Sequence, residues 1–299
     1  MTLVEETPLA AQPATAPDVR DVGVPAPRAR WFTALRHGRG LAGALLVGVV
    51  LLAGLAAPLL AKYPPLEQIP GANLVPPDAA HWLGTDEVNR DVLSRVLFGI
   101  RADLLVLVTA VPLGALVGAL AGLLSSLSAA TDVVAQRVFD LLLAFPVLIL
   151  GIALAAVVGP GLTTVGLVIT LAEIPVFGRL LRGAALRVRE MPYVEAATVV
   201  GAGRWWVLRR HVLPNAVEPA GVQLAVSLSV AVFVEGAMSF IGIGIRPPDP
   251  SLGSIIADSV SKLDANPAMA LGPLAVVVAL VLGFLLVAQA LAAGRRVAG

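Results

Sequence analysis

Long apolar segments restrict the possible folds of this chain more than any other feature of its sequence. The first spans residues 41–61, and a helix of that length reaches roughly 31 Å at about 1.5 Å per residue. The hydrocarbon core of a bilayer is about 30 Å thick, so this segment is long enough to cross it. Five further segments follow, at residues 104–124, 141–158, 162–181, 216–245 and 268–293. The sequence therefore predicts an all-α membrane protein with six transmembrane helices.

The composition of the chain points to the same class. Hydrophobic residues make up 58% of the 299 residues and charged residues only 14%, against roughly 25% charged in ordinary soluble domains. A soluble chain of this length could not bury so much apolar surface, so part of that surface must face lipid. The formal net charge of +1 gives no reason to expect nucleic-acid binding. Cysteine is absent, and the histidines are too scattered to predict a metal site; they are His37, His81 and His211.

The distribution of arginine predicts how the helices are oriented. Most arginines fall in segments on the same side of the membrane as the N-terminus. The largest group lies in the loop between the fourth and fifth apolar segments. Cytoplasmic loops of membrane proteins are rich in Lys and Arg. Both termini are therefore expected in the cytoplasm, and an even number of spans likewise places them on the same side of the membrane.

Charged residues just before the second apolar segment indicate an amphipathic helix. Arg90, Asp91 and Arg95 recur at helical spacing after Thr85, which is a candidate N-cap, and valines such as Val96 form the opposite, apolar face. We expect this helix at the outer membrane interface. Its charged face could be solvated or could contact an external binding protein, and the sequence leaves both interpretations open.

Glycine and acidic residues inside the apolar segments have different interpretations. Glycines recur every four residues in the second segment, a pattern that lets another helix approach closely; they are Gly114, Gly118 and Gly122. Glu235 lies within the fifth segment, and Glu173 and Asp140 lie nearer span ends. A charge at the bilayer centre costs about 2.5–3.5 kcal/mol. These three acids are candidates for lining a substrate path, or alternatively for an internal hydrogen bond or a subunit contact.

The loop between the fourth and fifth segments contains a short helix pattern. Pro192 can open a helix because its missing N–H is not needed there, and Glu195 falls in the first turn, where the helix dipole favours an acid. Gly201 and Gly203 are expected to end this helix. On physical grounds alone the segment could be an ordinary amphipathic connector.

The same loop resembles the signature of permease subunits of ATP-binding-cassette importers. The matching positions are Glu195, Ala196, Ala197, Gly201, Leu213 and Pro214. In that family the loop forms a coupling helix that docks into a groove on an ATPase subunit. The resemblance implies a docking surface made of Tyr193, Glu195, Ala196, Ala197 and Gly201.

Three more stretches resemble the dipeptide, oligopeptide and nickel group of this family, and specifically the "C"-type permease of each pair. They are residues 83–101, 140–146 and 235–244, the last followed by Pro247 and Pro248. The resemblance implies a type I importer permease fold in the plasma or inner membrane, and alternating-access transport of di- or oligopeptides or a similar small solute. Which solute is carried, and whether nickel is one, stays open.

The expected organisation combines the spans with this resemblance. The segments are a disordered cytoplasmic tail at 1–38, a first transmembrane helix at 39–61, an extracytoplasmic loop with the amphipathic helix at 62–100, a permease core of five transmembrane helices at 101–293 with its cytoplasmic coupling loop at 183–215, and a cytoplasmic tail at 294–299.

The resemblance also implies which partners the chain works with. They would be two ATP-binding subunits, a second permease subunit, which could be a copy or a different chain, and an extracytoplasmic solute-binding protein. The only lysines are Lys62 and Lys262, and neither follows glycine, so a Gly-Lys-Ser/Thr phosphate loop is excluded. We therefore expect no cofactor on this chain, which would not itself be an enzyme, and ATP with Mg²⁺ on the partner subunits.

Two other function classes were weighed against transport driven by ATP. A proton-coupled secondary transporter would use Glu173 and Glu235 as relay groups in the membrane. A membrane-embedded hydrolase would need a Gly-x-Ser-x-Gly elbow or a His–Glu zinc helix, and the sequence contains neither.

Overall fold

The fold was analysed in a computed structural model that describes residues 35–36 and 38–296. Within this part of the chain every regular element is a helix, apart from one isolated bridge between Thr85 and Asp91. The long helices are α2 (Gly38–Leu55), α4 (Val92–Ser125), α7 (Leu162–Arg189), α11 (Ala220–Phe240) and α13 (Ala268–Arg296). The predicted tail at 1–38 lies almost entirely outside the described residues, as does the end of the tail at 294–299.

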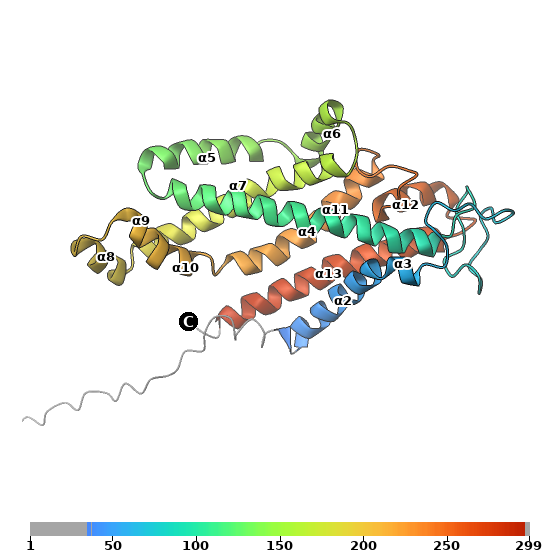
Figure 1. Cartoon of the computed structure of the whole chain (residues 1–299), viewed down its shortest axis with the longest axis horizontal. Helices are drawn as coiled ribbons and strands as arrows, with labels where there is room; N and C mark the ends of the chain where they lie inside the picture. The colour runs from blue at the N-terminus through green and yellow to red at the C-terminus, as the bar shows by residue number, and fades with distance from the viewer. Residues whose placement is uncertain (1–34, 37, 297–299) are drawn as a thin grey trace, which may run out of the picture.

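Shorter helices connect the long ones. They are α3 (Ala57–Leu60), α5 (Ala129–Leu143), α6 (Val147–Val158), α8 (Pro192–Val199), α9 (Arg204–Val207), the π-helix η1 (Leu208–Val212), α10 (Leu213–Ala216), α12 (Leu252–Ser259) and the 3₁₀ helix η2 (Val260–Lys262). The long helices run roughly along one axis (Figure 1), with α8 and α9 at one end of the bundle and α12 with the loop before α4 at the other. The beginning of α2 and the end of α13 lie side by side.

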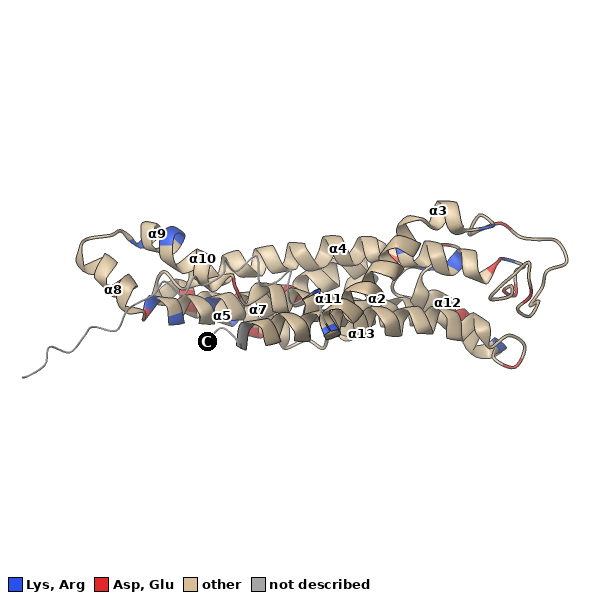
Figure 2. Ribbon diagram, turned by 90° about the horizontal axis from the view of Figure 1, so that it is seen from below, with Lys and Arg blue, Asp and Glu red and all other residues tan. Residues whose placement is uncertain are grey.

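Six membrane crossings are compatible with these helices in the described residues. The five long helices are each long and apolar enough to span a bilayer, and α5 with α6 makes a sixth if the pair counts as one span. Figure 2 shows Lys and Arg around α9 and at the neighbouring ends of α5 and α7. This end of the bundle is therefore the one that the positive-inside rule places in the cytoplasm.

The third predicted span is not one continuous helix. The sequence indicated a single helix over residues 141–158, but α5 and α6 meet at an angle of 85°. Pro146 is the cause, because proline lacks the N–H that a helix needs and disfavours helical backbone at the residue before it. Pro146 itself is extended at φ −56° and ψ 132°, directly before α6 begins. Hydropathy identified residues 141–158 as an apolar segment, but it could not indicate the bend between α5 and α6.

The expected amphipathic surface helix is also absent as a separate element within the described residues. Residues 92–100 are instead the first turns of α4, which is capped by Asp91 and not by Thr85. The Asp91 carboxylate accepts a 2.8 Å hydrogen bond from the Ser94 N–H. Arg95 is only 2% exposed and lies beside Asp86, so the charged face is not solvated. The reason is that the preceding loop folds back over the beginning of α4.

Two other predicted spans have different limits in the structure. The first was expected to run to residue 61, but α2 ends at Leu55 and the short helix α3 follows. The fifth was expected over residues 216–245, and α11 covers only Ala220–Phe240. Apolar residues continue beyond both helices, which is why hydropathy alone extended them.

Glycines set the distance between α4 and α7, as the small-residue pattern predicted. A Cβ added at Gly118 would collide with the backbone carbonyl of Ile174, and one at Gly122 would collide with that of Gly178. Gly114 meets the backbone of Thr170 in the same way. The two backbones therefore touch along several turns, and α4 and α7 form the centre of the bundle.

Candidate functional site

The predicted docking helix is present and begins where proline indicated. α7 ends at Arg189, and α8 follows after Glu190 and the extended residue Met191. Pro192 is in the first turn of α8, where its missing N–H is not required. Glu195 is also in the first turn, where the positive end of the helix dipole favours a carboxylate.

Gly201 ends α8 through a specific hydrogen-bonding pattern. Its φ of +88° is in the left-handed region, which glycine adopts without strain. The N–H of Ala202 donates to the carbonyl of Ala197 at 3.0 Å, and the N–H of Gly201 donates to the carbonyl of Thr198 at 3.0 Å. This pair of bonds is the Schellman motif. Gly203, which was also expected to end the helix, instead precedes α9 as its N-cap.

One side chain of α8 fixes the helix to the membrane-spanning part of the protein. Val194 is 2% exposed and packs in an apolar cluster with Leu181 and Val188 of α7. Val207 of α9 and Val212 of η1 belong to the same cluster. The predicted coupling loop is therefore a packed unit on the end of α7 and not a loose connector.

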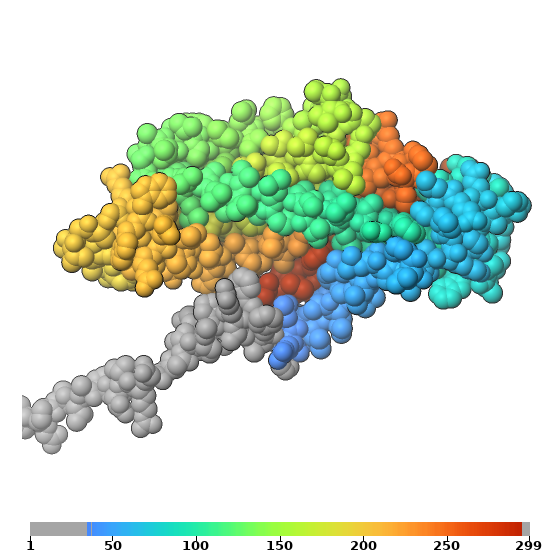
Figure 3. Space-filling view, viewed as in Figure 1, coloured from blue at the N-terminus to red at the C-terminus, as the bar shows by residue number. Residues whose placement is uncertain are grey.

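The opposite side of α8 faces outward. Tyr193, Glu195 and Ala196 are exposed, and Ala197 is half-buried. The segment from α8 to α9 forms the projecting tip at one end of the molecule (Figure 3). All five predicted docking residues, Gly201 included, thus lie on or directly after one helix with a free outer surface.

An aromatic cluster connects α8 to the segment that follows it. The ring centroids of Tyr193 and His211 are 5.7 Å apart, and those of Trp206 and His211 are 5.1 Å apart. Contacts of this kind stabilise a pair of rings by about 0.5–1.5 kcal/mol. The Leu213-Pro214 pair of the sequence motif starts α10 immediately after this cluster.

The three predicted substrate-path acids do not lie together. Glu235 is 2% exposed within α11 and accepts a 2.7 Å hydrogen bond from Ser239 Oγ one turn further on. Glu173 of α7 is 7% exposed and accepts a 2.6 Å hydrogen bond from Ser227 Oγ. Asp140 is exposed near the end of α5, where it forms an ion pair with Arg179. Each acid already has a partner, so the structure does not assemble them into one site.

A further buried acid was not among the predicted candidates. Asp103 of α4 is 3% exposed and lies beside Glu235. Its carboxylate accepts a 3.0 Å hydrogen bond from the N–H of Leu252, at the beginning of α12. Asp103 directly precedes the apolar segment at 104–124, so hydropathy did not include it in the span, although α4 buries it inside the protein.

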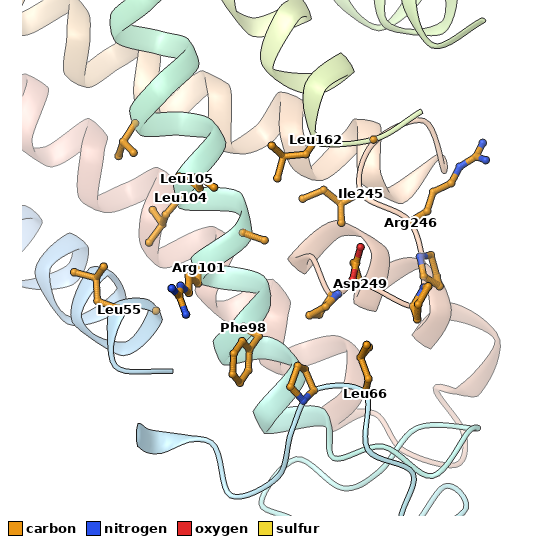
Figure 4. Close-up of a pocket in the computed structure, with 18 of the residues that line it drawn as sticks. Leu55, Leu66, Phe98, Arg101, Leu104, Leu105, Leu162, Ile245, Arg246 and Asp249 are labelled. Carbon is orange, nitrogen blue, oxygen red and sulfur yellow. The ribbon is translucent and has the colours of Figure 1, made fainter. Parts of the chain in front are cut away.

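A cavity of about 1000 Å³ was also missed. It lies at the end of the bundle opposite α8, between the end of α2, the outer half of α4 and the loops at 65–66, 160–162 and 245–250. Its walls are mainly apolar, and Leu55, Leu104 and Leu162 project into it (Figure 4). Arg101 and Asp249 are among the few charged residues that line it. Five separated segments build this cavity, and no local sequence pattern could indicate it.

Comparisons with known proteins place these features in context. Residues 110–297 match the family described as "Binding-protein-dependent transport system inner membrane component". The chain is similar to the probable D,D-dipeptide transport system permease protein DdpC of Escherichia coli K12, with 38% identity over 216 residues, which is 72% of either chain. It is also similar to the glutathione transport system permease protein GsiD of Pectobacterium atrosepticum, with 32% identity over 281 residues, 93% of either chain.

A solved structure shares the fold. An inward-facing form of the MetNI methionine ABC transporter aligns with a TM-score of 0.52 and 20% identity, over 68% of this chain and 94% of that one. At this level of identity the likeness concerns the arrangement of helices alone.

Proposed function

This chain belongs to the family of inner membrane components of binding-protein-dependent transport systems, and we propose that α8 is the element through which a separate ATPase subunit drives it. The chain is a multi-pass inner-membrane permease subunit of a peptide importer of the ATP-binding-cassette class. Within that importer we assign ATP and Mg²⁺ to two partner subunits, and we expect a second permease and an external solute-binding protein to complete the assembly.

The exposed outer face of α8 is the observation that carries this proposal. Ala196 has a small side chain, so a partner backbone can approach the helix closely there, and Glu195 offers a charge to a basic group on that partner. The helix is held in place by Val194 on its other side. A rigid helix with a free, small-residue face is suited to fit into a groove on another protein.

The packing behind α8 provides a route for movement into the membrane. Val194 contacts the end of α7, and α7 lies against α4 along the glycine face at Gly118. A displacement of α8 would therefore move α7 as a rigid rod and change its contacts with the rest of the bundle. Such a change would open the substrate path alternately to either side, which is the mechanism we propose for transport.

A bulky substitution on the outer face tests the proposal. Ala196→Trp should prevent the ATPase subunit from co-purifying with the permease and should abolish ATP-dependent uptake of a labelled dipeptide, while membrane insertion stays normal. Ala129→Trp is the matched control, because Ala129 is exposed at the same end of the bundle, on α5. Normal ATPase binding and uptake in Ala196→Trp would contradict the proposal.

A further inference from the structure

Two opposite charges, neither of them paired within the described residues, line the apolar cavity at the outer end of the bundle. Arg101 of α4 and Asp249 of the loop after α11 both border this space and are both exposed. Neither side chain has a hydrogen bond or ion pair to any other residue that the structure describes. They stand on different segments of the cavity wall (Figure 4). The cavity therefore presents a positive and a negative group that do not neutralise each other.

The rest of the wall can offer little polar recognition. Much of it consists of proline, namely Pro65, Pro160, Pro247, Pro248 and Pro250. Proline has no backbone N–H, so these positions supply no hydrogen-bond donors. Most other lining residues are aliphatic or aromatic, such as Leu55, Phe98 and Leu105. A polar ligand in this cavity would depend on the few charged side chains for its orientation.

We propose that this cavity binds the peptide on its way through the permease and recognises both of its charged ends. Arg101 pairs with the C-terminal carboxylate and Asp249 with the N-terminal ammonium, while the apolar wall at Phe98 and Leu105 accepts hydrophobic side chains. This inference rests on the proposed transport function and adds a selective site within the permease itself. A free short peptide is the ligand class that combines two opposite charges with apolar side chains.

The chemistry and the size of the cavity both fit this ligand. Guanidinium groups bind carboxylates through two parallel hydrogen bonds, and such charge-assisted bonds are stronger than neutral ones. Small-molecule sites commonly have volumes of about 300–1,000 Å³, and this one measures about 1000 Å³. The segments that form it lie at the end opposite α8, which is the extracytoplasmic end in the proposed orientation. A peptide arriving from outside would meet the cavity before the centre of the membrane.

A second arginine on the rim provides a matched control. Arg246 also borders the cavity, but its Nε donates a 2.7 Å hydrogen bond to the carbonyl of Gly242 in its own loop. Figure 4 shows its side chain directed away from the centre of the cavity. Arg246→Gln removes a positive charge from the same rim without removing the group that we assign to the carboxylate.

The test uses the complete importer reconstituted in lipid vesicles with its binding protein and ATP. Uptake of labelled Leu-Leu is measured beside two labelled analogues, Leu-Leu-amide and N-acetyl-Leu-Leu, which each lack one charged end. The variants are Arg101→Gln, Asp249→Asn and the control Arg246→Gln. The same binding protein is present throughout, so a difference between variants reports on the permease alone.

The expected results are specific for each end of the peptide. Arg101→Gln should raise KM for Leu-Leu about tenfold or more, which is the effect of losing one charge-assisted hydrogen bond, and should leave KM for Leu-Leu-amide at its wild-type value. Asp249→Asn should also raise KM for Leu-Leu about tenfold or more. It should leave KM for N-acetyl-Leu-Leu, which lacks the ammonium group, at its wild-type value. Arg246→Gln should resemble the wild type with all three peptides.

Two outcomes would overturn the inference. Both can be distinguished from a failure of the proposed transport function. One is an unchanged KM for Leu-Leu in both Arg101→Gln and Asp249→Asn. The other is an equal loss with free and blocked peptides, as expected if the cavity holds a phospholipid and not the substrate. In either case ATP-dependent uptake by the wild type and its loss in Ala196→Trp would still support ATPase-driven transport.

Discussion

Ser227 on α11 donates a 2.6 Å hydrogen bond through its Oγ to the carboxylate of Glu173 on α7. Both side chains are buried, at 2% and 7% exposure. The bond therefore joins, inside the membrane, the helix that leads into the coupling loop and the helix that leaves it. A movement that starts at α8 has two routes into the bundle, through α7 directly and through this contact to α11.

Removing this hydrogen bond should destabilise the permease. Ser227→Ala leaves the buried Glu173 carboxylate without its partner, and an unsatisfied buried polar group costs about 1–3 kcal/mol. We expect a lower melting temperature in detergent, measured by tryptophan fluorescence. Thr109→Ala is the control, because the Thr109 hydroxyl bonds only to carbonyls of its own helix. Equal melting temperatures for both variants would show that the bond does not contribute to stability.

The close contact of α4 and α7 should tolerate no side chain at Gly118. A Cβ there would overlap the carbonyl of Ile174, and overpacking of a well-packed interface typically costs about 1–3 kcal/mol. Gly118→Ala should therefore lower both stability and transport. Gly166→Ala is the matched control, because a Cβ at Gly166 of the adjoining helix meets nothing within 4 Å. If the two alanine variants have the same melting temperature, glycine does not set this helix distance.

The end of the coupling helix should depend on Gly201 and not on Gly203. Gly201 has φ +88° and Gly203 has φ −68°. Alanine at Gly201 must adopt a left-handed conformation that costs about 1–2 kcal/mol, so we expect α8 to fray and ATPase stimulation by the permease to fall. Gly203→Ala introduces the same methyl group without that strain. The comparison is made on purified assemblies by the rate of ATP hydrolysis, and equal rates would count against a structural role for Gly201.

The beginning of α4 should depend on Asp91. Its carboxylate accepts bonds from the Ser94 N–H at 2.8 Å and the Ser94 hydroxyl at 2.7 Å, and its other oxygen lies 2.9 Å from His81 Nδ1. Loss of an N-cap typically costs about 0.5–2 kcal/mol. Asp91→Ala should thus increase protease cleavage of the loop at 61–91 from the outside. Glu67→Ala is the control, because Glu67 is exposed in the same loop and its side chain has no hydrogen bond or ion pair within the described residues. An unchanged cleavage pattern would exclude Asp91 as the cap that holds this loop.

The sequence predicted those parts of the fold that depend on local pattern. Hydropathy identified the apolar segments, the spacing of Gly118 and its neighbours indicated a close helix contact, and Pro192 marked the beginning of α8. Each of these is decided by residues within a few turns of one another. Apolar composition is the same for a straight and a broken helix, so hydropathy could not indicate the break at Pro146.

Features that depend on distant segments could not be predicted in the same way. The sequence placed Arg95 on the charged face of an amphipathic helix. In the structure the loop before α4 covers it and leaves it 2% exposed. Asp103 gained its partner from Leu252, 149 residues further along the chain. The outer cavity with Arg101 and Asp249 requires five segments to meet. Hydrophobic periodicity in a sequence describes the faces of one helix at a time. Sites formed by several distant segments can therefore be recognised only from the tertiary structure.

A single cysteine offers the most direct test of ATPase docking at α8. The natural chain contains no cysteine, so Ala196→Cys gives one reactive thiol on the outer face of the helix, and Ala129→Cys gives a control thiol at the same end of the bundle. The measurement is cross-linking of each variant to the ATPase subunit with a short bifunctional reagent. We expect a cross-linked permease–ATPase product from Ala196→Cys and none from Ala129→Cys. Active transport by Ala196→Cys without any cross-link, or labelling of its thiol only from the extracytoplasmic side, would contradict the account.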